Sequence, residues 1–228
     1  MLPLKIIDPM PKRPFVTTGL ILICCLIFWK QPVFFPEPGL VPLDMLHSII
    51  HPDSTLPGKI LSLFTAFFLH GGFMHLAGNM WYLWIFGSAL EQHVRRVRFF
   101  AGYMAFGVVS LAVQVAADPL SSIPIVGASG AIAGIMGMYL VIRPLSRVQL
   151  WFPPVFFFRL PAVVVLAGWF WLQWYNAGKV HGPGGGVAWW AHIGGFITGV
   201  GAGLYARISG RRRRTDNGRR AQRKSIDK

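Results

Sequence analysis

The charged residues of this chain are so widely spaced that six long segments contain none. These uncharged segments are between 16 and 31 residues long. They lie at 14–29, 60–90, 99–117, 119–142, 160–178 and 180–206. A helix needs about 20 residues to cross the roughly 30 Å hydrocarbon core of a bilayer. Because 54% of the 228 residues are also hydrophobic, the sequence predicts an all-α polytopic membrane protein with six transmembrane helices.

The first uncharged segment has a second interpretation, a secretory signal, because Lys12 and Arg13 precede a short apolar stretch. The stretch ends at Lys30-Gln31-Pro32-Val33 rather than at a small-x-small cleavage site. We therefore interpret it as the first membrane helix, with Lys30 reaching the interface. Cys24 and Cys25 are adjacent within this helix and imply no disulfide framework.

The positive charges indicate how the six helices are oriented. With six spans, both termini lie on one side, and that side receives 19 of the 22 Lys and Arg residues. The opposite side receives Lys30, Lys59 and Lys179. Since Lys and Arg accumulate in cytoplasmic loops, we expect an N-in, C-in orientation.

This topology divides the chain into three parts. Residues 1–14 form a cytoplasmic N-terminal segment, 15–206 the six-helix domain and 207–228 a basic tail. The first outer loop, about 31–69, is long, apolar and proline-rich, so we expect short interfacial helices in it. The tail lacks apolar and aromatic clusters and is expected to be disordered and attracted to anionic lipid headgroups. Without stacking aromatics, nucleic-acid binding is not expected.

Polar side chains within a membrane are costly, so those in the predicted spans require an explanation. His75 and Asn79 are four residues apart and share one helical face. Ser129 is surrounded by glycine and alanine, and a helix from it to Ile142 has 14 residues, about 21 Å. Such a helix begins roughly 10 Å below the outer surface if Arg143 marks the inner interface. Taken separately, each feature is typical of helix packing or interhelical hydrogen bonding.

His192 lies on a stripe of small residues formed by Gly195, Gly199 and Gly203. This spacing predicts close backbone packing against another helix, for which the glycine-containing segment after Ser129 is the natural partner. Packing these helices brings His192 towards Ser129. A serine, a histidine base and two donors on a third helix form a nucleophile, base and oxyanion-stabilising set.

The sequence resembles the rhomboid intramembrane serine proteases of the bacterial six-helix type. The motifs are HGGFMHLAGN at 70–79, GASG at 127–130 and AHIGG at 191–195, and the resemblance covers about 15–206. It implies a serine-type endopeptidase that cleaves transmembrane segments of single-pass or other membrane proteins. It also implies Ser129 as nucleophile, His192 as base, and His75, Asn79 and the Ser129 backbone N–H as the oxyanion hole. We expect a multi-pass protein of the bacterial inner membrane with no cofactor.

Two positions depart from the family pattern. The Trp-Arg pair of the first outer loop is replaced by Leu61-Ser62, which leaves the anchoring of that loop open. Ala133 stands where some members carry a tyrosine that stacks on the histidine, so His192 must be oriented by other packing. No aspartate lies in a span, so no third triad carboxylate is expected.

Other classes remain as alternatives. A catalytically inactive rhomboid-like protein that binds membrane clients is the main one, although it requires neither Ser129 nor His192. A transporter is disfavoured because no inverted repeat or intramembrane carboxylate chain is present. Zinc proteolysis lacks the H-E-x-x-H motif, and no metal site is expected, although His70, His75 and His192 are chemically able to bind one.

Overall fold

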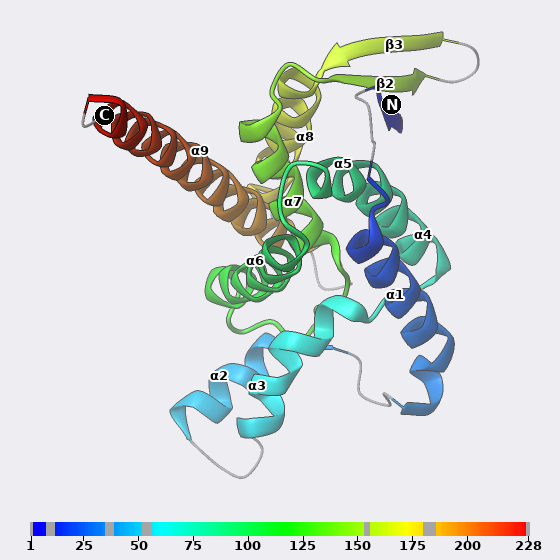
Figure 1. Cartoon of the computed structure of the whole chain (residues 1–228). Helices are drawn as coiled ribbons and strands as arrows, with labels where there is room; N and C mark the ends of the chain where they lie inside the picture. Colours follow the sequence, from blue (N-terminus) through cyan, green and yellow to red (C-terminus); the bar gives the residue numbers. More distant parts are fainter. Residues whose placement is uncertain are drawn as a thin grey trace.

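The computed structural model of the protein describes residues 2–7, 12–34, 39–51, 56–152, 156–179 and 186–226. These residues form a mostly helical fold with one small sheet (Figure 1). The α-helices are α1 Phe15–Phe34, α2 Pro42–Ile50, α3 Leu56–Thr65, α4 Phe73–Tyr82, α5 Ser88–Glu91, α6 Arg96–Ala117, α7 Ser129–Ile142, α8 Ala162–Ala177 and α9 Trp189–Ile226. Two short turns, η1 Ala66–Phe68 and the π-type η2 Leu83–Gly87, join helices in the first half of the chain.

Helix α7 lies at the centre of the fold, beside α6 and α9 (Figure 1). Its contact with α9 is close enough to involve backbone atoms. A Cβ on Gly195 would collide with the carbonyl of Gly130, and one on Gly199 with the carbonyl of Gly134. Only glycine permits this approach, which fixes the two helices at a short separation.

Helix α1 is attached to α5 by a buried carboxylate. Glu91 is 4% exposed and accepts hydrogen bonds from the backbone N–H groups of Val16 and Thr17, at 3.0 and 2.9 Å, and from the Thr17 hydroxyl at 2.8 Å. These N–H groups belong to the first turn of α1, where helical N–H groups lack partners and favour negative charge. Glu91 therefore caps α1 from a neighbouring helix.

The fold is not entirely helical, so the all-α prediction is wrong in this respect. Strands β1 Leu2–Ile6, β2 Arg147–Phe152 and β3 Phe156–Pro161 form an antiparallel sheet in the order β1-β2-β3. In β2 the buried Val148 and Leu150 alternate with the more polar Arg147 and Gln149, which is the period of a strand. The sheet lies at the end of the bundle near α5 and the start of α8 (Figure 1).

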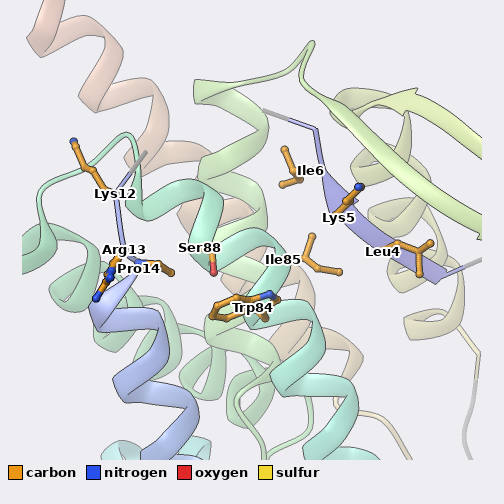
Figure 2. Close-up of a pocket in the computed structure, with 9 residues that line it drawn as sticks. All are labelled: Leu4, Lys5, Ile6, Lys12, Arg13, Pro14, Trp84, Ile85 and Ser88. Carbon is orange, nitrogen blue, oxygen red and sulfur yellow. The ribbon is translucent and has the colours of Figure 1, made fainter. Parts of the chain in front are cut away.

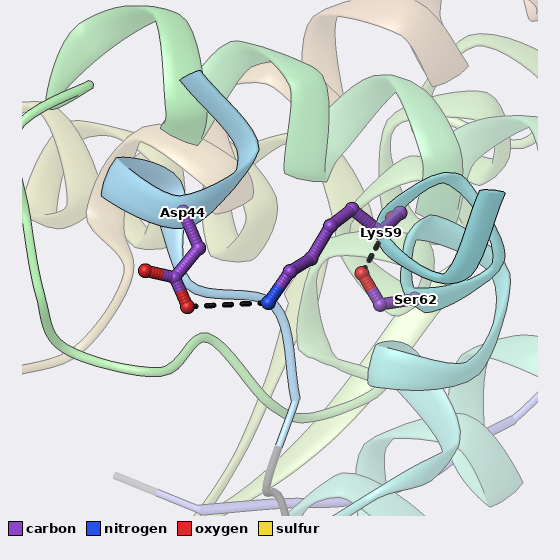
Figure 3. A network of polar contacts seen from close by, with 3 residues as sticks. All are labelled: Asp44, Lys59 and Ser62. Atoms are coloured by element: carbon purple, nitrogen blue, oxygen red, sulfur yellow. Dashed lines mark hydrogen bonds and ion pairs between the residues drawn. The ribbon is translucent and has the colours of Figure 1, made fainter. Parts of the chain in front are cut away.

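The first long loop contains short helices, as predicted. Helices α2 and α3 are joined by an ion pair of 3.2 Å between Asp44 and Lys59, and Ser62 Oγ donates to the Lys59 carbonyl at 2.6 Å (Figure 3). Leu40, before α2, exchanges two backbone hydrogen bonds with Ile125, at 3.0 and 2.8 Å. The loop is thus attached to the segment that leads into α7, without a Trp-Arg pair.

By length and apolarity, one described helix, α6, is able to span a membrane by itself. A second candidate is the pair Leu56–Phe68 and Phe73–Glu91, whose two parts are bent by 76°. Phe15–Gln31 and α7 are apolar but shorter. These are fewer spans than the six predicted from the sequence, and α7, with 14 residues, is shorter than a full span because it begins only at Ser129.

The C-terminal tail differs from the prediction of disorder. Helix α9 continues through most of 207–228 and ends at Ile226. The physical reason is that Arg, Lys, Ala and Gln are good helix formers, and adding residues to an existing helix avoids the cost of nucleation.

Candidate active site

Ser129 occupies the first residue of α7, at the end of a non-helical segment. Helix α7 runs from Ser129 to Ile142, the bounds that the sequence predicts. Before it, the Gly127 N–H donates to the Ala66 carbonyl at 3.1 Å, and Ile125 pairs with Leu40. Backbone polar groups within a membrane protein must be satisfied internally. These bonds hold the segment extended, so that the helix begins at the serine.

His192 lies near the start of α9 and faces Ser129. Its Nε2 is 2.7 Å from Ser129 Oγ. The beginning of α9 is held by Gln114 of α6, whose Oε1 accepts the Ala191 N–H at 3.1 Å. Ser129 and His192 are thus brought within hydrogen-bond distance by two helices that touch through glycine backbone. This is the geometry that proton transfer from a serine to a histidine requires.

The other ring nitrogen of His192 contacts a residue that sequence reasoning missed. Gln173, on α8, places its Oε1 2.7 Å from His192 Nδ1. Gln173 is 6% exposed, and its Nε2 donates to the Trp169 carbonyl at 3.1 Å. The signal in the sequence was an amide within the uncharged segment 160–178, where a polar side chain is costly.

Aromatic rings surround the buried histidine. The Trp169 and Trp189 rings have their centroids 5.8 and 6.1 Å from that of His192. Ala133, where a stacking tyrosine is absent, is fully buried within α7. The orientation of the imidazole therefore comes from α8 and α9 instead of from a ring on α7.

His75 and Asn79 project from α4 towards the segment before Ser129. A Cβ built on Gly127 would lie 2.7 Å from both Cε1 and Nε2 of His75 and 3.4 Å from Asn79 Nδ2. Gly127 also has φ of +115°, a conformation suited to glycine. Both side chains thus lie against Gly127, two residues before the serine.

The side-chain amide of Asn79 is a buried hydrogen-bond donor for which the described residues provide no acceptor. Asn79 is 8% exposed, and its Nδ2 has no hydrogen-bond partner among the described residues. A buried donor that lacks a partner costs about 1–3 kcal/mol, so such groups are rare unless they have a use. An acceptor oxygen brought within hydrogen-bond distance of Nδ2 would satisfy it.

The start of α4 is anchored through His70, the first residue of the HGGFMHLAGN motif. The backbone N–H and C=O of His70 are both bonded at 3.1 Å to the side-chain amide of Gln31, on α1. The His70 ring also contacts the His75 ring, with centroids 5.3 Å apart. His70 therefore positions the helix that carries His75 and Asn79.

In the described part of the chain, no three His, Cys, Asp or Glu side chains come together as metal ligands. A cavity of about 310 Å³ lies elsewhere, between the N-terminal segment and the η2–α5 region (Figure 2). Its lining residues are Leu4, Lys5, Ile6, Lys12, Arg13, Pro14, Trp84, Ile85 and Ser88. None of these belongs to the Ser129 site.

Comparison with known proteins gives a consistent family assignment. Residues 57–209 match the Rhomboid domain, which is more than half of the chain. The chain therefore belongs to the rhomboid family, a family of membrane proteins that includes intramembrane proteases, and the resemblance inferred from the motifs is confirmed.

Three relatives illustrate the similarity. The "Putative rhomboid protease YdcA" of Bacillus subtilis is 33% identical over 136 residues, covering 56% of this chain and 63% of the relative. The mitochondrial rhomboid protein 1 of Saccharomyces cerevisiae is 30% identical over 149 residues, covering 64% and 41%. The rhomboid protease GluP of Bacillus subtilis is 37% identical over 90 residues, covering 40% and 17%. The chain thus spans less than two thirds of the length of these relatives.

Proposed function

We propose that this protein is an intramembrane serine protease that hydrolyses peptide bonds in transmembrane segments of other membrane proteins. The observation that carries the proposal is the 2.7 Å contact between Ser129 Oγ and His192 Nε2. Membership of the rhomboid family and the names of the relatives support the same reaction.

Within this proposal, Ser129 is the nucleophile and His192 the general base. His192 removes the hydroxyl proton as Ser129 Oγ attacks the substrate carbonyl carbon, and the carbonyl oxygen becomes an oxyanion. The imidazolium then returns the proton to the leaving amine, and water hydrolyses the acyl-enzyme by the same steps. Histidine is suited to both transfers because a nitrogen of the neutral ring accepts a proton and the same nitrogen of the imidazolium donates it.

We assign the oxyanion hole to the side chains that lie against Gly127. The proposed donors are the His75 side chain, Asn79 Nδ2, which has no hydrogen-bond partner among the described residues, and the backbone N–H of Ser129; His75 and Asn79 both lie against Gly127. Donors placed in advance stabilise charge as it develops, without reorganisation during the reaction. A Cβ at Gly127 would collide with the His75 ring, so glycine is what lets His75 lie against the segment before Ser129.

We also propose six spans with both termini in the cytoplasm, residues 15–206 as the protease domain and a bacterial plasma membrane as the location. The excess of positive charge on one side supports this orientation. In this arrangement Ser129 begins its helix below the outer surface, where a frayed substrate helix and water both have access. The basic residues after 206 then face anionic lipid.

Cleavage of a transmembrane substrate tests the proposal. The protein is reconstituted in liposomes with a fluorescent single-span polypeptide that contains small and helix-breaking residues, and products are analysed by mass spectrometry. Wild type should cut within or beside the span, whereas Ser129→Ala should not. Equal cleavage by both proteins contradicts the assigned nucleophile. Binding of the polypeptide without cleavage by correctly folded wild type favours the inactive client-binding alternative.

A further inference from the structure

His192 has a hydrogen-bond partner on each ring nitrogen, and the two partners come from different helices. Nε2 faces Ser129 on α7, and Nδ1 faces Gln173 on α8, each at 2.7 Å. Gln173 is buried, and it sits between the histidine and the Trp169 carbonyl. The arrangement Ser–His–Gln has the order of a catalytic triad with an amide in the third position.

The amide of Gln173 is able to take only one orientation. Its Nε2 donates to the Trp169 carbonyl at 3.1 Å, and a carbonyl oxygen is purely an acceptor. If the amide were rotated by 180°, two oxygen atoms would face each other at that position. The Trp169 carbonyl therefore directs Gln173 Oε1, rather than its NH₂ group, at His192.

This orientation determines which nitrogen of neutral His192 carries the proton. An acceptor at 2.7 Å from Nδ1 requires Nδ1 to be the donor, so the proton lies on Nδ1. The Nε2 lone pair is then directed at the Ser129 hydroxyl, as a general base requires. In the opposite tautomer, Nε2–H would face the serine and no lone pair would be available to accept its proton.

We infer that Gln173 is a positioning residue that fixes the tautomer and orientation of His192. This inference rests on the proposed function. It also accounts for the absence of an intramembrane aspartate, because a neutral amide performs the orienting task without the cost of burying a charge. Unlike a carboxylate, the amide adds no negative charge to stabilise the imidazolium, so its effect is confined to alignment and tautomer selection.

The size of the expected effect follows from the neutral character of this bond. The stabilisation that one neutral hydrogen bond provides corresponds to about a tenfold change in reaction rate. Individual bonds differ from this value by a few-fold. Removal of Gln173 should therefore slow the chemistry by about tenfold. Removal of Ser129 or His192, which take part in bond making and proton transfer, should abolish it.

The experiment combines kinetics with a direct measurement of the tautomer. Wild type, Gln173→Met, Gln173→Glu and Asn176→Leu are purified as full-length protein in detergent, and the rate of labelling by a fluorophosphonate is measured. Methionine keeps the length of the side chain without the amide, and glutamate as the neutral acid keeps both an acceptor oxygen for Nδ1 and an O–H donor for the Trp169 carbonyl. Asn176 is the matched control, because on the same helix its amide donates to the Leu172 carbonyl at 2.7 Å.

The inference predicts slow labelling of Gln173→Met, about a tenth of the wild-type rate, with labelling of Gln173→Glu and Asn176→Leu within a few-fold of wild type. In ¹⁵N-histidine NMR, the His192 signals, assigned by their loss in His192→Ala, should report Nδ1–H in wild type and a mixture in Gln173→Met. Unfolding curves of each variant exclude loss of fold as the cause.

Two results would overturn the role of Gln173. One is a Gln173→Met protein that is labelled as fast as wild type, and the other is an Nε2–H tautomer in wild type. If the proposed protease function is wrong, the result is different: wild type is not labelled, or labelling persists in Ser129→Ala. The NMR measurement tests Gln173 in either case.

Discussion

Two helix contacts in this protein are built differently. One joins α7 to α9, and the other joins α2 to α3. In the first, glycine allows the backbone of one helix to touch that of the other, and the pair carries Ser129 and His192. In the second, two short helices are joined by the Asp44–Lys59 pair, and α3 has no buried residue. Of these two contacts, the one that holds two site side chains at hydrogen-bond distance is formed by backbone against backbone, and the one that holds no site residue is formed by partly exposed side chains.

The largest expected effect comes from breaking the first contact. Gly199→Val places side-chain atoms where the Gly134 carbonyl lies, so α7 and α9 must separate. We expect a loss of 3 kcal/mol or more in the free energy of unfolding and no detectable activity, because collision with backbone cannot be relieved by a rotamer change. Titration with a denaturing detergent measures the first quantity.

Gly201→Val is the matched control for this variant. It adds the same side chain to the same helix at a position with no atom within 4 Å of the added Cβ. Its stability should stay within about 1 kcal/mol of wild type, the range of a change in helix propensity. Equal losses in both variants would contradict the close-packing account.

The next effect concerns catalysis and leaves the helix contact intact. Asn79→Ala removes a donor that has no partner among the described residues, so it should cost little stability. Loss of one oxyanion donor raises the barrier by about 2.7–4 kcal/mol, so turnover should fall about a hundredfold or more. The measurement is the rate of substrate cleavage in liposomes, with Asn176→Ala as the control amide; an unchanged rate removes Asn79 from the oxyanion hole.

An intermediate effect is expected where α1 joins α5. Glu91→Gln replaces an acceptor oxygen by an NH₂ group, which then faces a backbone N–H of Val16 or Thr17. The free energy of unfolding should fall by about 1–3 kcal/mol, the cost of an unsatisfied buried group. Asp118→Asn, which changes an exposed carboxylate, should alter stability by less than about 0.5 kcal/mol. Comparable values for the two variants would show that Glu91 is not a cap.

The smallest effect is predicted for the α2–α3 contact. Asp44 is 49% exposed and Lys59 27% exposed at the side chain, and exposed ion pairs contribute about 0–1 kcal/mol. Asp44→Asn should therefore lower the free energy of unfolding by less than about 1 kcal/mol, and added salt should reduce the difference. A loss as large as that of Gly199→Val would contradict the contrast between the two contacts.

Local sequence patterns were sufficient to predict the central helix α7 and its packing on α9. The position of Ser129, the charge at Arg143 and the glycine spacing predicted the bounds of α7 and its packing on α9. These features are local, because each depends on residues within one helix and on the costs of a membrane environment. The family motifs added the order of the site residues along the chain.

The parts that were not predicted depend on distant residues. Strand β1 pairs with β2, about 145 residues later, and no local pattern in 2–6 indicates that partner. The amide of Gln173 becomes important only because α8 places it beside His192. Periodicity and charge spacing identify elements, and a stripe of glycines indicates close helix packing, but these patterns do not specify which strand pairs with which or which side chains meet between helices.

Labelling with a fluorophosphonate serine probe measures whether His192 activates the Ser129 hydroxyl. The proteins are wild type, Ser129→Ala, His192→Ala and, as a matched control, Ser110→Ala, whose buried hydroxyl donates to the Gly107 carbonyl. We expect labelling of wild type and Ser110→Ala, and none of Ser129→Ala or His192→Ala. Labelling that persists without Ser129 or His192, or a folded wild type that is not labelled, would contradict an activated Ser129–His192 pair.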